Sequence, residues 1–314
     1  MTSRRARLKA LVLGPVLPIV FVVMWTSGFI VGPIGVSVAP PLALTLWRFI
    51  VAAVVMGVVS LLTRAPWPRG RAAWLQLVAT GILMQATLFA GAYLGLSMGV
   101  SAGLAALING ASPVLVAAAG TFVLKEKLSI LQWAGTALGF VGLAIAVSGE
   151  LGGGSTGAGI GFILMGTVGF AAGTLIQRRT GAKMDLRTGA TVQLATAAVV
   201  MAPIAALHDG LTIPVNVTSV ASLLWLAIGN SGLAFAVMFF MLRTRSAADT
   251  TRIILLVPPL TSVVAWPVLG QAPQLPIWIG LVVAGVGILI ASRAPRPAPG
   301  EPVAEPVLEP AATR

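Results

Sequence analysis

The pentapeptide Ala52-Ala53-Val54-Val55-Met56 recurs unchanged at residues 197–201, 145 positions further along the 314-residue chain. At the same offset, and without a gap, further matches continue along both halves. They are Gly28 with Gly173, Ser101-Ala102 with Ser246-Ala247, Pro113 with Pro258, Leu124 with Leu269, Trp133 with Trp278, Gly135 with Gly280 and Val141-Gly142 with Val286-Gly287. Because one register holds over this length, the sequence predicts an internal duplication, with repeats at residues 1–149 and 150–293.

Long apolar stretches make up most of both repeats. The chain is 57% apolar and 9% charged, whereas a soluble protein carries roughly 25% charged residues. Several stretches reach the ~20 apolar residues that a helix needs to cross a bilayer. They are 10–31, 41–62, 73–96, 100–124, 130–148, 158–177, 188–207, 220–242, 247–268 and 275–292. Since lipid offers the backbone no hydrogen bonds, we expect an all-α integral membrane fold with ten transmembrane helices.

Each predicted repeat contains five spans, which is an odd number. The second repeat must therefore enter the membrane from the side opposite to the first. We expect two inverted five-helix repeats, related by a pseudo-two-fold axis in the membrane plane. This arrangement is typical of secondary transporters, whose substrate site lies near the midplane where the repeats meet.

The positions of Lys and Arg predict the orientation. Basic residues precede the first span, follow the tenth and occur in every even-numbered loop, and the odd-numbered loops contain none. By the positive-inside rule, both termini are cytoplasmic in a multi-pass protein of a bacterial-type inner (plasma) membrane. A signal peptide cleaved after Ala39 is the alternative for the first span. We disfavour it because the apolar stretch exceeds the about 7–15 residues of such a peptide and Pro40 would follow the cut.

The last 21 residues, 294–314, differ in composition from the rest of the chain. They are rich in Pro, Ala and Glu, with Glu-Pro pairs at 301–302, 305–306 and 309–310. Such a segment buries too little apolar surface to fold, so we expect a disordered cytoplasmic tail.

Several classes of chemistry lack the residues they need. The sequence has no cysteine and one histidine, His208, and it contains no P-loop and no GxSxG motif. We therefore expect no metal, no cofactor and no enzymatic activity. The net charge of +12 comes from small basic groups between apolar stretches, so we do not expect nucleic acid as a partner. The expected partners are membrane lipid and a small-molecule substrate, and the sequence does not indicate an oligomeric state.

Arg48 is the outstanding polar residue, because it lies about seven residues inside the second span. Ionisable groups at such a depth are costly and often functional. A functional Arg48 would attract a carboxylate or phosphate. The alternative is a structural arginine that braces neighbouring helices or extends towards the headgroups.

Neutral polar residues supply the rest of the predicted site. The 145 offset pairs Gln85 with Asn230 and Arg48 with Gln193, and it places polar groups of both repeats around the axis. Asn109 and Ser231 are polar residues of the same kind without an assigned role, and each amide has interhelical hydrogen bonding as an alternative. The predicted cavity is lined by Trp25, Gly28, Arg48, Gln85, Tyr93, Gln193 and Asn230.

Asp and Glu are absent from the middle of every predicted span. The sequence therefore lacks the buried carboxylate that usually carries the proton in a coupled pump. Asp249 and Arg252 lie three residues apart at the cytoplasmic start of the ninth span and share a helix face. We expect them to pair with one another or to gate the inner mouth.

Short motifs add a resemblance to a known family. They are Trp25 with Gly28, Arg48-Phe49, Pro113 followed by Glu126, Gln132 with Gly135, Gly139 and Gly142, and in the second repeat Pro258, Gln271, Gly280 and Gly287. In these the chain resembles the EamA-type branch of the drug/metabolite transporter superfamily over residues 10–292, although Gln271 stands where that pattern usually has Glu. The resemblance implies a ten-helix transporter of small metabolites, very often an exporter of amino acids.

The favoured function is therefore a secondary transporter that exports a small polar metabolite, such as an amino acid, by alternating access. A passive facilitator (uniporter) of similar solutes is the alternative, and the missing mid-span carboxylate favours it. A more remote alternative is an intramembrane enzyme acting on lipid-linked substrates, but His208 beside Asp209 is a weak candidate for its catalytic group. A structural scaffold is a further alternative, and it would not explain Arg48.

Overall fold

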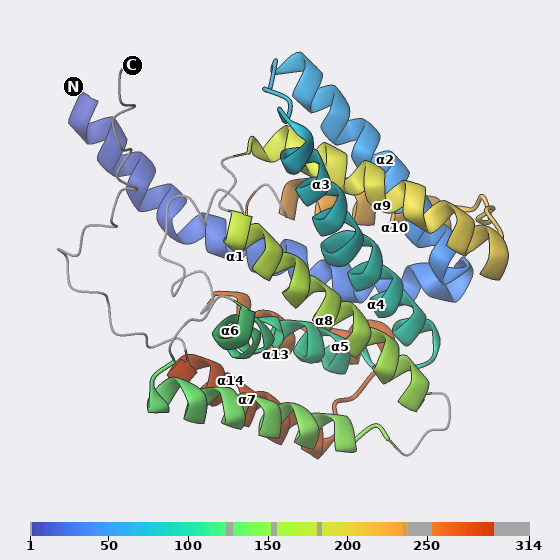
Figure 1. Cartoon of the computed structure of the whole chain (residues 1–314). Coiled ribbons are helices and arrows are strands. Elements are labelled where there is room, and N and C mark those ends of the chain that lie inside the picture. Colours follow the sequence, from blue (N-terminus) through green and yellow to red (C-terminus); the bar gives the residue numbers. More distant parts are fainter. Residues whose placement is uncertain are drawn as a thin grey trace, which may run out of the picture.

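The computed structural model describes residues 2–123, 128–151, 156–180, 184–234, 237 and 253–291, and the secondary structure in these ranges is helical throughout (Figure 1). The first half contains α1 (Thr2–Val38), α2 (Pro41–Leu62), α3 (Arg71–Thr80), η1 (Gly81–Ala86), α4 (Thr87–Ser97), α5 (Ala102–Gly110), α6 (Ser112–Val123) and α7 (Ile130–Ser148). The second half contains α8 (Thr156–Thr180), α9 (Leu186–His208), α10 (Val217–Leu224), η2 (Trp225–Ala234), α13 (Val257–Leu269) and α14 (Leu275–Ala291).

The predicted spans correspond to these helices where the structure describes them, and parts of the spans predicted at 220–242 and 247–268 lie outside the described residues. In the described ranges, eight helical segments are long and apolar enough to cross a membrane, and α13 and α14 are shorter apolar helices. The first span lies further along the chain than its prediction of 10–31, since its apolar part is Val16–Val38. The helix continues to Val38 because Ala39, the residue before Pro40, is the first that proline steers away from the α region. The chain is thus an all-α membrane protein of two five-helix repeats.

Spans four and nine are interrupted at equivalent positions. α5 ends at Gly110 and α6 begins at Ser112; in span nine, residues 255–256 form a turn before α13 begins at Val257. At the 145 offset, this turn falls on residues 110–111, and Pro258 falls on Pro113. Proline lacks a backbone N–H and is tolerated in the first turn of a helix but not in its interior. The repeated proline therefore accounts for two broken helices.

Spans three and eight share a second irregularity. Each changes from α-helix to a wider π-helical stretch, η1 at Gly81–Ala86 and η2 at Trp225–Ala234. At the 145 offset, η1 falls on residues 226–231, inside η2. Short π-helical segments are frequently found at functional sites, so this part of both repeats is a candidate region for the site.

α7 and α14 lie side by side and show how the two repeats are related (Figure 1). A Cβ atom added to Gly135 would lie 2.6 Å from the Gly287 carbonyl oxygen, and one added to Gly142 would lie 2.8 Å from that of Gly280. Gly280 and Gly287 are the 145-offset equivalents of Gly135 and Gly142, so each glycine meets the equivalent of the other. This reciprocal contact is the pattern of a two-fold axis, and it requires antiparallel helices. Only glycines allow backbones to approach this closely.

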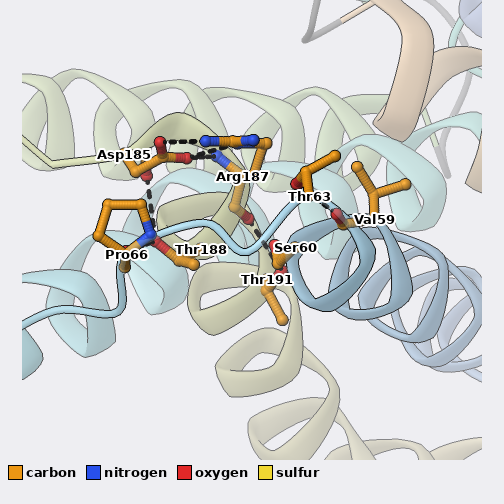
Figure 2. Close-up of polar contacts among 8 residues, drawn as sticks. All are labelled: Val59, Ser60, Thr63, Pro66, Asp185, Arg187, Thr188 and Thr191. Atoms are coloured by element: carbon orange, nitrogen blue, oxygen red, sulfur yellow. Dashed lines mark hydrogen bonds and ion pairs between the residues drawn. The ribbon is translucent and has the colours of Figure 1, made fainter.

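α2 and α9 form another pair between the repeats, and Figure 2 shows their contacts at the end where α9 begins. Asp185 accepts a hydrogen bond from the backbone N–H of Arg187 and forms an ion pair with its guanidinium at 2.7 Å. Thr188 donates to the Pro66 carbonyl at 2.8 Å, and the Thr191 and Ser60 hydroxyls lie 3.2 Å apart. The contacts of Thr188 and Thr191 connect the end of α2 and the loop after it to the first two turns of α9.

Candidate functional site

Arg48 lies at the centre of a hydrogen-bonded group that connects the two repeats. Its side chain is 1% exposed. Nε donates to the Ser231 hydroxyl at 2.8 Å, Nη2 to the Asn230 side-chain oxygen at 2.7 Å, and Nη1 to the Tyr93 hydroxyl. The guanidinium carbon also lies 3.8 Å from the centre of the Phe89 ring. All of these partners are neutral, so the positive charge is hydrogen-bonded but not neutralised by them.

Two consecutive side chains of η2, Asn230 and Ser231, both accept hydrogen bonds from Arg48. The Asn230 amide also donates to the Met24 carbonyl at 3.1 Å. A Cβ on Gly28, one helical turn further along α1, would lie 2.5 Å from the Asn230 amide nitrogen. The glycine at 28 therefore leaves the space that Asn230 occupies between α1 and Arg48.

A cavity of about 530 Å³ lies next to this group. Its volume is within the range of about 300–1,000 Å³ found for small-molecule pockets. Five of the seven predicted site residues line it: Trp25, Gly28, Arg48, Tyr93 and Asn230.

Gln85 and Gln193 are not among the lining residues. Gln193 donates to the Thr80 hydroxyl at 2.9 Å, so it contacts span three and does not meet Arg48. Gln85 on η1 is 4% exposed, and its side-chain oxygen has no hydrogen-bond partner in the described part of the chain. The two repeats thus differ in the contacts of these equivalent residues. Arg48 contacts Asn230 in η2, whereas Gln193, the equivalent of Arg48, contacts Thr80, the residue before η1.

Both broken helices contribute to the cavity wall. Gly110, Ser112 and Pro113 line it from the break in span four, and Ile254 and Val257 line it from the break in span nine. Interrupted helices at corresponding positions of two repeats are the structural signature of a binding site in transporters of inverted topology. The sequence contained this signal in Pro113 and Pro258.

Two phenylalanines belong to the site in addition to the predicted aromatic residues Trp25 and Tyr93. Phe89 lies against the Arg48 guanidinium, and Phe170 of α8 lines the cavity. Phe170 is the 145-offset equivalent of Trp25, so the repeat register could have identified it. Ser231, which accepts a hydrogen bond from Arg48, is a polar residue without a predicted role.

One end of the cavity reaches the side where the basic loops lie. Leu128, Gln132, Arg178 and Ala291 line it there; they are near the start of α7 and near the ends of α8 and α14.

Hydrogen bonds join the helices at the opposite side. The backbone N–H of Ala102 donates to the Gln271 side chain at 2.9 Å, and that of Ser101 donates to Glu150 at 3.1 Å. Asp209 likewise accepts from the Leu42 N–H at 2.6 Å. These groups cap the starts of α5 and α2, whose first N–H groups have no partner within their own helices. Asp209 thereby has a structural contact that the sequence did not indicate.

Two further sequence predictions concern a gating pair and metal ligands. Asp249 and Arg252, the expected gating pair, lie outside the described residues. Within the described ranges, no group of three or more His, Cys, Asp or Glu side chains is placed to hold a metal ion.

Similarity to known proteins agrees with this geometry. The EamA-like transporter family model matches residues 12–148 and 157–293. A probable terminal-alkyne amino-acid exporter of Streptantibioticus cattleyicolor is 28% identical over 281 residues, 87% of this chain and 91% of that protein. An uncharacterized transporter of Archaeoglobus fulgidus is 28% identical over 279 residues, which are 86% of this chain and 93% of that protein.

Two further similarities are more limited. A probable amino-acid metabolite efflux pump of Salmonella typhimurium is 30% identical over 137 residues, 44% of each chain. A protein crystal structure with 18% sequence identity matches the fold with a TM-score of 0.62 over 88% of this chain and 95% of that one. With both repeats matched by one family model, the chain belongs to the EamA-like transporter family.

Proposed function

We propose that this chain is a secondary transporter that exports a small carboxylate-bearing metabolite, such as an amino acid, by alternating access. The observation that carries the proposal is the charge of Arg48, held by neutral partners at the wall of the cavity. Guanidinium has five N–H donors, and three of them are used in these bonds. The positive charge, which these three partners do not neutralise, favours an anionic or zwitterionic solute in a low-dielectric site.

The direction of transport is proposed from the side of the molecule that the cavity lining reaches. Gln132 and Arg178, at one end of the lining, are close in sequence to loops that carry Lys and Arg. By the positive-inside rule these loops and both termini are cytoplasmic, so the cavity takes up substrate from the cytoplasm of a bacterial-type cell. The names of the relatives from Streptantibioticus and Salmonella, an exporter and an efflux pump, support the same direction.

The same proposal includes the organisation of the chain. Repeats at 1–149 and 150–293 move relative to one another around the cavity, and residues 294–314 form a cytoplasmic extension. A passive facilitator is the second candidate, and the absence of Asp and Glu from the cavity lining in the described residues favours it. Flux in proteoliposomes with and without an imposed proton gradient separates the two.

The test of the proposal is exchange of radiolabelled amino acids by purified protein in liposomes. Arg48→Gln removes the charge and gives α2 the side chain of its repeat equivalent. We expect it to lower exchange of carboxylate-bearing solutes at least tenfold, and Arg48→Lys to keep part of the activity because it keeps the charge without the fork of donors.

Arg71→Gln is the matched control, since Arg71 is an exposed arginine at the start of α3. Melting temperatures in detergent show whether each variant is folded. A folded Arg48→Gln protein that exchanges amino acids as fast as Arg71→Gln would contradict the proposed role of Arg48.

A further inference from the structure

Trp25 and Phe170 line the same cavity from α1 and α8, and they are equivalent residues of the two repeats at the 145 offset. Both side chains are half-buried, so each has surface left for a ligand. The two repeats thus each supply one large aromatic side chain at the same position.

Other equivalent pairs also line the cavity. They are Phe29 with Thr174, Asn109 with Ile254 and Ser112 with Val257. A cavity that includes both members of several pairs lies on the pseudo-two-fold axis, where residues related by the axis face one another. Trp25 and Phe170 are therefore expected on opposite sides of the cavity.

The breaks of spans four and nine differ in chemistry. Asn109 and Ser112 are polar, whereas their equivalents Ile254 and Val257 are apolar. The other polar lining residues come from both repeats and include Arg48, Thr174 and Asn230, with Arg178 at the end of the cavity near the end of α8. Leu88, Leu96, Val116 and Phe21 add further apolar surface. A ligand that fits such a cavity has a charged group at the Arg48 end and an apolar body.

Other side chains pack against Trp25 and Phe170. Phe21 is 1% exposed, and its ring centre lies 5.3 Å from that of Trp25. Phe170 and Trp25 both pack against the buried cluster that contains Leu42, Phe49 and Leu194. Packing of this kind fixes the side chains before a ligand arrives, which reduces the entropy cost of binding.

We propose that Trp25 and Phe170 form a two-sided aromatic clamp that selects carboxylates with an aromatic or branched aliphatic side chain over those with small polar side chains. The inference rests on the proposed function, in which Arg48 attracts the carboxylate of the substrate. It adds which residues recognise the side chain of the substrate. Burial of such a side chain is favourable by about 1.5–3 kcal/mol, which corresponds to a preference of roughly 10- to 150-fold.

The experiment compares exchange of L-phenylalanine, L-leucine and L-serine in proteoliposomes. The wild-type protein is expected to prefer phenylalanine and leucine over serine at least tenfold. Phe170→Ala is expected to reduce the phenylalanine-to-serine ratio at least fivefold. Phe170→Leu keeps apolar bulk without the ring. We expect it to lower the rate of phenylalanine exchange relative to that of leucine exchange, and it remains informative if the alanine variant does not fold.

Phe122→Ala is the matched control, because Phe122 is 79% exposed on α6 and is not part of the cavity; its ratios should equal those of the wild type. A wild-type protein that exchanges serine as fast as phenylalanine, or a folded Phe170→Leu protein with unchanged ratios, overturns the clamp and leaves the proposed function intact. Failure of the wild type to exchange any of the three amino acids contradicts the proposed function, and the clamp with it.

Discussion

Arg48 illustrates how one residue combines a structural and a chemical role. Burying a guanidinium costs several kcal/mol unless its donors are satisfied. Ser231, Tyr93 and Asn230 satisfy three donors, and they come from both repeats. The bracing role and the attraction of an anion are therefore not exclusive, since neutral acceptors hold the side chain in place without cancelling its charge.

Gly28 offers a test of this group that does not alter any of its polar atoms. In Gly28→Ala the new Cβ would lie 2.5 Å from the Asn230 amide nitrogen, so Asn230 must move away from Arg48 and from the Met24 carbonyl. We expect a loss of about 1–3 kcal/mol in the free energy of unfolding and slower exchange of carboxylates. Thermal unfolding in detergent and liposome exchange measure the two effects.

Gly285→Ala in α14 is the control for that substitution. A Cβ at Gly285 meets no atom within 4 Å, and alanine is a better helix former than glycine by about 1 kcal/mol. Equal behaviour of the two alanine variants would show that Asn230 does not depend on the space at position 28.

At the scale of helices, the contacts between α5, α13 and α7 hold the charge-poor side together. Gln271 follows α13 and Glu150 follows α7, and both accept hydrogen bonds from the start of α5. These residues also line a second hollow, together with Ser262 and Gln274. A transporter that releases substrate on this side has to separate these elements.

Removal of the Gln271 acceptor should favour that separation. In Gln271→Ala the Ala102 N–H loses its partner, and a lost hydrogen bond of this kind shifts the balance by about 1 kcal/mol. Because the chain has no native cysteine, a single cysteine at Ser262, which is 1% exposed, reports opening through its rate of labelling by a membrane-impermeant thiol reagent. We expect several-fold faster labelling of Ser262→Cys in the Gln271→Ala background.

Gln274→Ala is the matched control, since Gln274 is an exposed amide in the same hollow. Labelling at the same rate in both backgrounds would mean that Gln271 does not contribute to closure of this side.

For the whole molecule, the orientation in the membrane remains a prediction from charge. Single cysteines at Arg69 and Val215, both exposed, lie in the loops after α2 and after α9. The positive-inside rule predicts that an impermeant maleimide labels Val215→Cys in intact cells and Arg69→Cys only after the membrane is opened. The opposite result would reverse the orientation and turn the proposed exporter into an importer.

The sequence by itself determined the number of spans and the register of the repeat. Apolar length decides whether a helix can cross lipid, and it is read directly from composition. The 145 offset paired Gly135 with Gly280 and Pro113 with Pro258, and the structure places these residues at a two-fold helix contact and at two broken helices. Arg48 was also identifiable, because a charge inside an apolar span stands out against its neighbours.

Only the tertiary structure decided which side chains share the cavity. A repeat register relates equivalent residues, but it does not require equivalent partners. Arg48 and Asn230 meet across one interface, whereas their equivalents Gln193 and Gln85 are not among the lining residues, and Gln193 bonds Thr80 instead. The physical reason is that the repeats carry different side chains and pack differently, so equivalent residues line the cavity in some places and not in others.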